Sequence, residues 1–377
     1  MPGNTNQSPS LKPATTALRI LLVADSEIVG ARVHKALDGQ PDIEITSQAR
    51  DGIGAVSAMR RSVFDAIVLD IGHAETNTAV ALSRMFKLDP TAKVVLVGSL
   101  SFANVKASMK LLVDGAAAFV PTPAAHTKTT SEAVFSHDLL EVLHAFEPSD
   151  REIDGRPTRG HFAEPPARIP AQSAKPIELR PISTIPPRVL AVGSSTGGPQ
   201  ALFAFIASLP SDLSIPVFIT QHMPANFTKL LADHIAKNTA RDCREAVDGE
   251  PIVAGRLYVA PGDYHMTVID KAGQSHIRLT EDDPVNYCRP SVDPMLDSIT
   301  DIYDGQVLAV ILTGMGADGA DSASRLVAKG GTVLAQNQET CVVWGMPRAV
   351  AEAGICSAVL PLDELGPFVG TLVKPKW

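Results

Sequence analysis

The chain alternates short apolar runs with stretches of helical periodicity, and this alternation constrains the possible folds more than any other feature. In the first part, strand-like runs cover residues 19–23, 43–46, 66–69, 93–97 and 118–120. Helical periods follow them at residues 28–37, 54–59, 78–86, 105–112 and 134–145. Short apolar runs that alternate with helical periods are typical of βα units. Five such units in series predict a doubly wound parallel sheet.

A second α/β part follows after a stretch without periodicity. Strands are predicted at 189–192, 217–220, 256–259, 307–312 and 332–335, and a hairpin at 266–269 with 277–279. Helices are predicted at 199–209, 226–237, 292–303, 318–329 and 362–372. The proline-crowded stretch between the two parts has no apolar face and is interpreted as an interdomain linker. The predicted organisation is a disordered tail (1–17), a first domain (18–147), a linker (148–187) and a second domain (188–377).

Composition sets limits on location and partners. The 377 residues suffice for two or three domains, and a formal net charge of −8 argues against a nucleic-acid or anionic-membrane partner. The four cysteines lie far apart without a C-x-x-C pair, which indicates neither a zinc site nor a disulfide framework. No apolar stretch reaches the roughly 18 residues needed to span a bilayer. We therefore expect a soluble, cytoplasmic protein without membrane insertion.

Chemistry is suggested by the turn that follows the first strand of the second part. Within the run VLAVGSSTGGPQAL, residues 193–197 match the G-x-S-x-G pattern, in which glycines permit a sharp strand-to-helix turn that exposes a serine hydroxyl. Ser195 is thus a candidate nucleophile. A tight βα turn with no catalytic role would explain the same small residues, so the pattern alone does not distinguish a nucleophilic serine from a structural one.

Two further strand ends carry candidate partners for this serine. His222 follows the strand at 217–220, and consecutive strands of a parallel sheet commonly lie side by side, which would place it at the same edge as Ser195. Asp318 lies in the glycine-rich turn after the strand at 307–312. Taken singly, the histidine could be a core residue and the aspartate a helix N-cap. Together the three form the set of a hydrolytic triad, in an order that differs from that of α/β-hydrolases and so favours convergence.

The second part resembles the catalytic domain of the CheB family of chemotaxis protein-glutamate methylesterases. The blocks GSSTGG, TQHMP, VAPGDYHM, PVNYCRPSVD, LTGMGADGA and AQNQETCVVWGMPRA carry the resemblance over residues 189–374. It implies a Rossmann-like domain with Ser195 as nucleophile, His222 as base and Asp318 as acid. It also implies that the N–H of Met315 serves as oxyanion donor and that Thr196 supports the site. The segment 289–291 is expected to shape the substrate groove, without a defined role.

The same resemblance implies the reaction and its partners. The expected substrates are γ-glutamyl methyl esters on the cytoplasmic helices of chemoreceptors, which yield glutamate and methanol. Deamidation of receptor glutamines is expected as well, and catalysis is expected to need no cofactor or metal. A chemotaxis histidine kinase is a further expected partner.

The first part resembles a flavodoxin-like response-regulator receiver domain, with acids after two of its strands and the run DGAAAFVPTP near the fifth. Carboxylates at the carboxyl edge of such a sheet can hold a hard cation and accept a phosphoryl group, although each could also be a turn or N-cap residue. The resemblance makes Asp70 the phosphoacceptor and Asp25 a magnesium ligand. The pattern departs from the family at Ala24, Gly98 and Thr122, where an acid, a switch hydroxyl and a lysine are expected. We therefore expect no stable phosphorylation at Asp70, no firm magnesium site, and a docking or inhibitory module.

Two alternatives from other classes of protein remain open at this point. The glycine-rich run at 193–198 could cradle a phosphate in a nucleotide-binding α/β protein. Against this, the run lacks the G-x-G-x-x-G spacing and a Walker lysine, and a histidine rather than an acid ends the next strand. The other alternative is a non-catalytic regulator that binds receptors, against which the intact Ser-His-Asp set argues.

Overall fold

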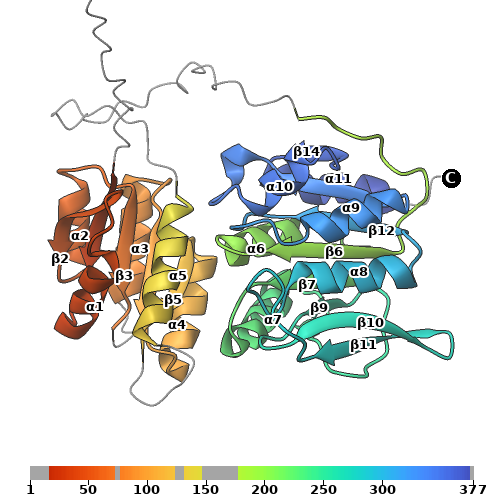
Figure 1. The fold of residues 1–377 in the computed structure, drawn as a ribbon, viewed down its shortest axis with the longest axis horizontal. Helices are drawn as coiled ribbons and strands as arrows, with labels where there is room; N and C mark the ends of the chain where they lie inside the picture. The colour runs from red at the N-terminus through yellow and green to blue at the C-terminus, as the bar shows by residue number, and fades with distance from the viewer. Residues whose placement is uncertain (1–16, 73–76, 124–130, 147–176, 374–377) are drawn as a thin grey trace, which may run out of the picture.

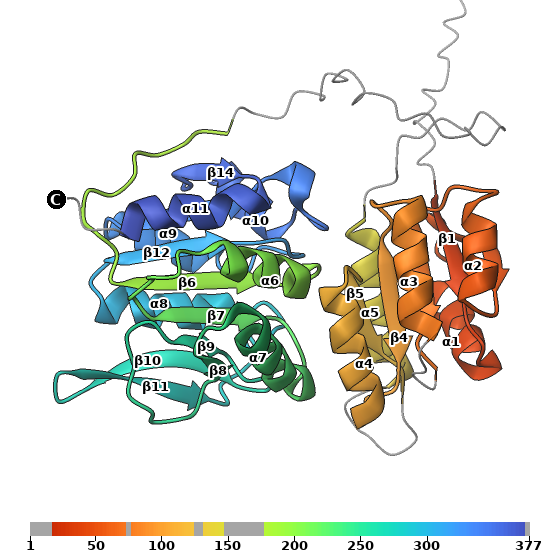
Figure 2. The same ribbon diagram turned by 180° about the vertical axis from the view of Figure 1, so that it is seen from behind.

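The computed structural model describes residues 17–72, 77–123, 131–146 and 177–373 and shows two α/β units. Each unit is built on a parallel sheet that is covered by helices on both faces (Figures 1 and 2). The predicted fold class is therefore confirmed. The predicted tail and most of the predicted linker lie outside the described residues, and the exact domain boundaries stay predictions.

The first unit has a five-stranded parallel sheet with the order β2-β1-β3-β4-β5. Its strands are β1 (Leu18–Val23), β2 (Ile43–Ala49), β3 (Ala66–Asp70), β4 (Val94–Gly98) and β5 (Ala118–Pro121). Its helices are α1 (Glu27–Leu37), α2 (Gly52–Met59), α3 (Asn77–Leu88), α4 (Phe102–Val113) and α5 (Glu132–His144). This order, which reverses beside β1, is the flavodoxin-like one.

Both faces of this sheet are apolar because neighbouring strand residues point to opposite sides. Leu21 and Leu69 belong to the core under α2, α3 and α4. Ile20 and Val68, each one position earlier, belong to the core under α1 and α5. Four of the helices have an N-cap residue whose side chain accepts a hydrogen bond from the backbone N–H three residues later. This satisfies one of the N–H groups that have no partner within the first helical turn. These capping residues are Ser26, Asp51, Ser101 and Ser131.

The second unit has a seven-stranded parallel sheet with the order β14-β13-β12-β6-β7-β9-β8. Its strands are β6 (Val189–Ser194), β7 (Val217–Gln221), β8 (Cys243–Glu245), β9 (Leu257–Val259), β12 (Val307–Ile311), β13 (Thr332–Gln336) and β14 (Ala358–Leu360). Helices α6 (Gly198–Ser208), α7 (Ala225–Thr239) and α11 (Leu362–Val373) pack on one face. Helices α8 (Val292–Ile302), α9 (Ala320–Ala328) and α10 (Met346–Glu352) pack on the other.

The predicted hairpin is present as β10 (His265–Lys271) and β11 (Gln274–Thr280), an antiparallel pair separate from the main sheet. Several elements differ from the prediction. The three-residue strands β8 and β14, the short helix α10 and the 3₁₀ turn η1 (Gln338–Thr340) were not predicted, because such short segments carry little periodic signal. The prediction that a helix begins at residue 318 was wrong: α9 begins at Ala320, after Gly319 with φ 88°.

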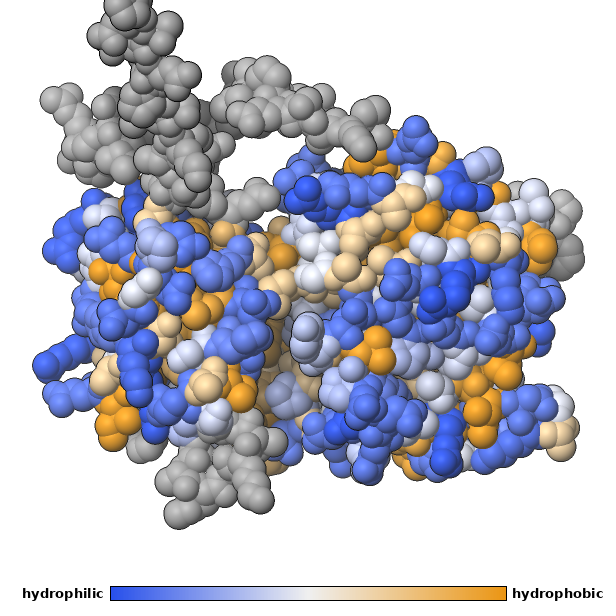
Figure 3. All heavy atoms as spheres, in the orientation of Figure 1, coloured by the Kyte–Doolittle hydropathy of each residue, from blue (hydrophilic) through white to orange (hydrophobic). Residues whose placement is uncertain are grey.

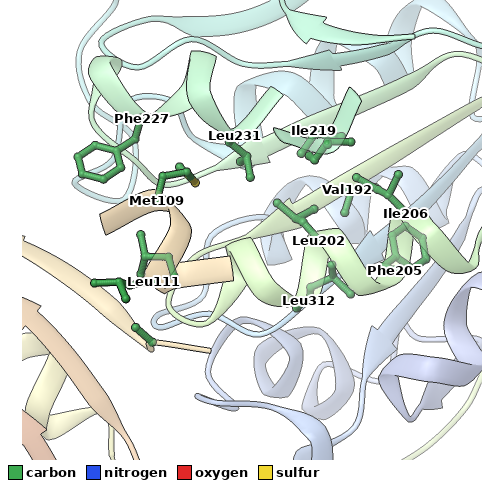
Figure 4. Close-up of a cluster of buried hydrophobic side chains, with 14 of the residues drawn as sticks. Met109, Leu111, Val192, Leu202, Phe205, Ile206, Ile219, Phe227, Leu231 and Leu312 are labelled. Atoms are coloured by element: carbon green, nitrogen blue, oxygen red, sulfur yellow. The ribbon is translucent and has the colours of Figure 1, made fainter. Parts of the chain in front are cut away.

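The two units share an apolar contact along α4 of the first and α6 and α7 of the second. The ring of Phe119 lies against Phe227, with ring centroids 5.1 Å apart. Figure 4 shows Met109 of α4 beside Leu231 of α7, within one continuous core. The outer face seen in Figure 3 is largely hydrophilic over both units, with small separate hydrophobic areas. No described helix has the length and apolar character that a membrane span requires.

Candidate active site

The second sheet brings three candidate residues to one edge. Strand β6 lies between β12 and β7, so the chain connections run in opposite directions from it, which is where α/β sheets commonly bind ligands. Ser195 directly follows β6, and His222 directly follows the neighbouring β7. Asp318 lies in the loop between β12 and α9. The side-by-side placement expected for the first two strands is thus observed.

The backbone around Ser195 is held tightly. Its N–H donates to the carbonyl of Thr313 at 3.0 Å, and its carbonyl accepts the amide of Gln221 at 2.8 Å. Gly314 passes so close that a Cβ there would lie 2.9 Å from the Cβ of Ser195 and 2.4 Å from the sulfur of Met346. Glycine at position 314 is therefore a steric requirement of the loop that faces the serine.

His222 is held from both sides of its ring. Its Nε2 lies 2.7 Å from Oδ2 of Asp318, and its Nδ1 lies 3.4 Å from the sulfur of Cys288. Within the part of the chain that the structure describes, no hydrogen bond joins the hydroxyl of Ser195 to His222. Because Asp318 occupies Nε2, the nitrogen that can accept a proton from the serine is Nδ1.

The carboxylate of Asp318 is buried and accepts hydrogen bonds from five donors. Besides His222, the donors all come from the segment that leads into α8. They are Asn286 Nδ2 at 3.0 Å, Ser291 Oγ at 2.7 Å, Val292 N at 2.6 Å and Asp293 N at 3.2 Å. The aspartate therefore does not cap its own helix but sits at the N-terminus of α8, where backbone N–H groups and the helix dipole favour an anion.

These donors were missed by the sequence reasoning. The segment 289–291 was expected to shape a groove, whereas Ser291 is fully buried and bonded to Asp318. Asn286 and Cys288 were not singled out at all. The run PSVDP does signal a helix start, but a helix start does not reveal which distant carboxylate it receives.

Asp318 and His222 shift each other's pKa in opposite directions. Burial would raise the pKa of Asp318, but the bond to His222, the charge of that ring and the donors Val292 and Ser291 hold the pKa well below its usual range. Burial likewise lowers the pKa of His222, yet the bonds to Asp318 and Cys288 outweigh it and raise the pKa to about 10. Burial raises the pKa of neighbouring Asp293, and the charge of Asp318 adds to that shift.

Met315 and Thr196 lie on the two turns that face each other across the site. Met315 lies in the loop after β12, next to Gly314, and Thr196 follows Ser195 directly. Among the hydrogen bonds of the described residues, none uses the backbone N–H of either residue. Two amide donors are therefore available beside the serine.

The first unit forms hydrogen bonds with the turn that follows Ser195 and with Val342. The N–H of Gly197, two residues after the serine, donates to the carbonyl of Ala117 at 2.8 Å. Lys93 donates from Nζ to the carbonyl of Val342 at 3.0 Å, and burial lowers its pKa. The receiver-like unit is thus bonded to the turn that carries the candidate nucleophile.

The acids of the first unit lie where they were expected along the chain. Asp70 ends β3 and accepts the N–H of Gly72 at 2.8 Å, while Asp25 is exposed after β1. A Cβ at Gly98 would lie 2.5 Å from the side chain of Ile71, so that side chain fills the place of a switch hydroxyl. No group of three or more metal-ligating side chains occurs among the described residues.

Fold and site together define a two-part protein in which a receiver-like unit is joined to a hydrolase domain built on a parallel sheet. The model of the family CheB methylesterase matches residues 190–369. A protein-glutamate methylesterase/protein-glutamine glutaminase of Azospirillum brasilense is 42% identical, over 93% of this chain and 92% of its own length. One of the same name from Paramagnetospirillum magneticum is 40% identical, over 96% and 97%. The solved catalytic domain of Thermotoga maritima CheB is 41% identical, covers 50% of this chain and 99% of that domain, and has a TM-score of 0.49.

The chain therefore belongs to the CheB methylesterase family. It is a hydrolase whose activities are those of the family, the hydrolysis of glutamate methyl esters and the deamidation of glutamines in proteins. The nucleotide-binding and non-catalytic alternatives are set aside by this membership.

Proposed function

We propose that Ser195, His222 and Asp318 carry out this hydrolysis, and that the substrates are methylated glutamates on the cytoplasmic helices of chemoreceptors. The observation that carries the proposal is the buried His222–Asp318 pair at 2.7 Å, placed on the strand ends that flank Ser195. An imidazole held by a buried carboxylate beside a partly buried turn serine is the arrangement that activates a hydroxyl for attack on an ester.

The reaction proceeds through an acyl-enzyme. His222 takes the proton of Ser195 on Nδ1 as the oxygen attacks the γ-carbonyl, and Asp318 stabilises the imidazolium. The imidazolium then protonates the departing methoxide, so that methanol leaves. A water molecule, deprotonated by the same nitrogen, cleaves the glutamyl-serine ester and restores the enzyme. With a glutamine side chain the leaving group is ammonia, and the other steps are unchanged.

Amide donors stabilise the negative charge that forms on the carbonyl oxygen. The N–H of Met315, which has no hydrogen-bond acceptor among the described residues, takes this role, and that of Thr196 lies on the facing turn. The backbone N–H of the residue after a nucleophile is a common second donor in such sites. Loss of one such donor costs about 3–4 kcal/mol of transition-state stabilisation in related enzymes. A donor on the backbone cannot be removed by side-chain substitution, so its position depends on the glycines around it.

The receiver-like unit restrains the site in this proposal. Its Ala117 binds the turn of the nucleophile, and its α4 covers α6 and α7. Release of this contact would expose the serine to a receptor helix, a shift between docked and open populations. A histidine kinase remains a proposed partner of this unit, although the departures around Asp70 argue against a stable phosphoryl group there.

The test is methanol release from methylated receptor by the Ser195→Ala variant. We expect release to be abolished while circular dichroism and thermal unfolding stay as in the native chain, because the side chain is small and only partly buried. Ser324→Ala is the matched control, since that hydroxyl is exposed on α9 and bonds only within its own helix. Native methanol release from the Ser195→Ala variant would contradict the assignment.

A further inference from the structure

Cys288 contacts Nδ1 of His222, the ring nitrogen that takes the proton of Ser195 in the proposed mechanism. Its sulfur lies 3.4 Å from Nδ1 of His222, and Nε2 of the same ring is bonded to Asp318. A ring nitrogen engages one hydrogen-bond partner in the ring plane at a time, whether it donates its N–H or accepts with its lone pair. The sulfur of Cys288 and the hydroxyl of Ser195 therefore compete for the same nitrogen.

The position of Cys288 is set by a tight turn. The backbones of Val285 and Cys288 exchange hydrogen bonds of 3.1 and 2.9 Å, and the two residues between them have φ of 52° and 62°. Positive φ at both central residues is the signature of a type I′ hairpin turn. Asn286 ties this turn to the acid of the site, because its Nδ2 donates to Oδ1 of Asp318 at 3.0 Å. The thiol is thus held against the ring by the same segment that holds the carboxylate.

No side chain of the turn from Val285 to Cys288 belongs to an apolar core cluster. Tyr287 at its tip is fully exposed, and Cys288 itself is partly exposed, so neither anchors an apolar cluster. The contact between Cys288 and His222 is therefore made by a side chain that no core packing fixes.

We propose that Cys288 is a positioning residue of the esterase: its thiol occupies Nδ1 of His222 in the resting enzyme and must release it before Ser195 can be deprotonated. This inference rests on the proposed roles of Ser195 and His222. It adds a step that those roles do not contain, a restraint on the base supplied by a side chain outside the triad.

The charge state of the ring follows the same contact. The titratable groups that face it are Asp318, on the loop after β12, and Cys288, on the turn before α8; Asp293 of α8 lies behind Asn286. Burial lowers the pKa of His222, but the bonds and charges of Asp318 and Cys288 raise it to about 10. A raised pKa favours the protonated ring, whose Nδ1–H donates to the sulfur of Cys288, and the ring must lose this proton before it can accept one from Ser195. Loss of the thiol removes one of the two groups that favour the protonated form, so the pKa of the ring must fall.

The first experiment compares the pH dependence of kcat/KM for ester hydrolysis in the full chain and in Cys288→Ser and Cys288→Ala. The acid limb of the profile is expected to move to lower pH in both variants, because the sulfur is one of the groups that raise the pKa of the ring. Cys243→Ser, on β8 and away from the triad, is the control and should leave the limb in place. An unmoved limb in both Cys288 variants overturns the proposal, whatever happens to the rate, because a purely structural role would scale the profile without shifting it.

The second experiment needs no substitution. Iodoacetamide alkylates a thiolate with formation of an S–C bond and loss of iodide, and mass spectrometry locates the label. The acid limb of the pH profile of the labelled native chain is expected to move to lower pH, as in the two variants, in proportion to the labelled fraction of Cys288 and independently of label on Cys341. An unmoved limb with Cys288 fully labelled overturns the proposal. If Ser195→Ala remains active, the proposed function fails instead, so the two failures are distinguishable.

Discussion

Replacement of Ser291 by alanine tests how the buried acid of the site is held. The hydroxyl of Ser291 donates to Oδ1 of Asp318 at 2.7 Å, and the two residues are 0% and 2% exposed. A hydrogen bond to a charged group contributes about 1.5–3 kcal/mol, and four other donors remain on the carboxylate. We therefore expect Ser291→Ala to lower the free energy of unfolding by about 2 kcal/mol, which is about 4–8 °C in Tm for a domain of this size.

The pH dependence of this loss follows from the sign of the pKa shift. The Ser291 bond is one of the causes that hold the pKa of Asp318 below its usual range. A depressed carboxyl pKa contributes stability that is present above the unfolded value of about 3.9 and is lost as pH falls through the folded pKa. The difference between native chain and variant should therefore be constant from pH 5 to 8. It should shrink only in the acid range, where Asp318 takes up a proton.

The assay is urea unfolding of Ser291→Ala, Asp318→Asn and the double variant, with Ser324→Ala as the surface control. The control should stay within about 0.5 kcal/mol of the native chain. The effect of Ser291→Ala should become smaller in the Asp318→Asn background, because the charge that strengthens the bond is gone. A loss below about 0.5 kcal/mol at pH 7, or an equal loss in both backgrounds, would refute the reasoning. Activity should fall far less than the roughly 10⁴-fold drop known for loss of the triad carboxylate, since His222 keeps its partner.

Two further predictions concern the receiver-like unit. A chain that starts at Ile177 lacks the receiver-like unit but keeps the segment before β6, in which Arg180 N donates to Cys356 O. It should hydrolyse methylated receptor about tenfold faster than the full chain, which corresponds to a docked state favoured by about 1.4 kcal/mol. An unchanged rate would show that docking does not restrain the site. Incubation with small phosphodonors should leave the full chain without stable label, because Thr122 replaces the lysine and Ile71 fills the space at Gly98; robust label that disappears in Asp70→Asn would contradict this.

Much of the fold could be predicted from the sequence because it depends on local patterns. Apolar runs of three to six residues between helical periods indicated both parallel sheets, and residues that directly follow a strand, such as Ser195 and His222, could be assigned to one edge. Helix starts were less well defined. The helix predicted from residue 318 begins at Ala320. The preceding Gly319 has a positive, non-helical φ and therefore still belongs to the loop.

The sequence by itself determined the fold class, the family resemblance and the candidate triad, since each rests on residues within one strand-and-turn segment. Only the tertiary structure decided what surrounds that triad. Ser291 and Asn286 lie 27 and 32 positions from the aspartate that they hold, and Cys288 lies 66 positions from the ring that it contacts. Hydrogen bonds between such distant segments depend on strand order and on the direction of a helix N-terminus, which no local pattern encodes. The sequence thus pointed to the groups that react, while the packing of α8 against the end of β12 determined how the acid and the base are held.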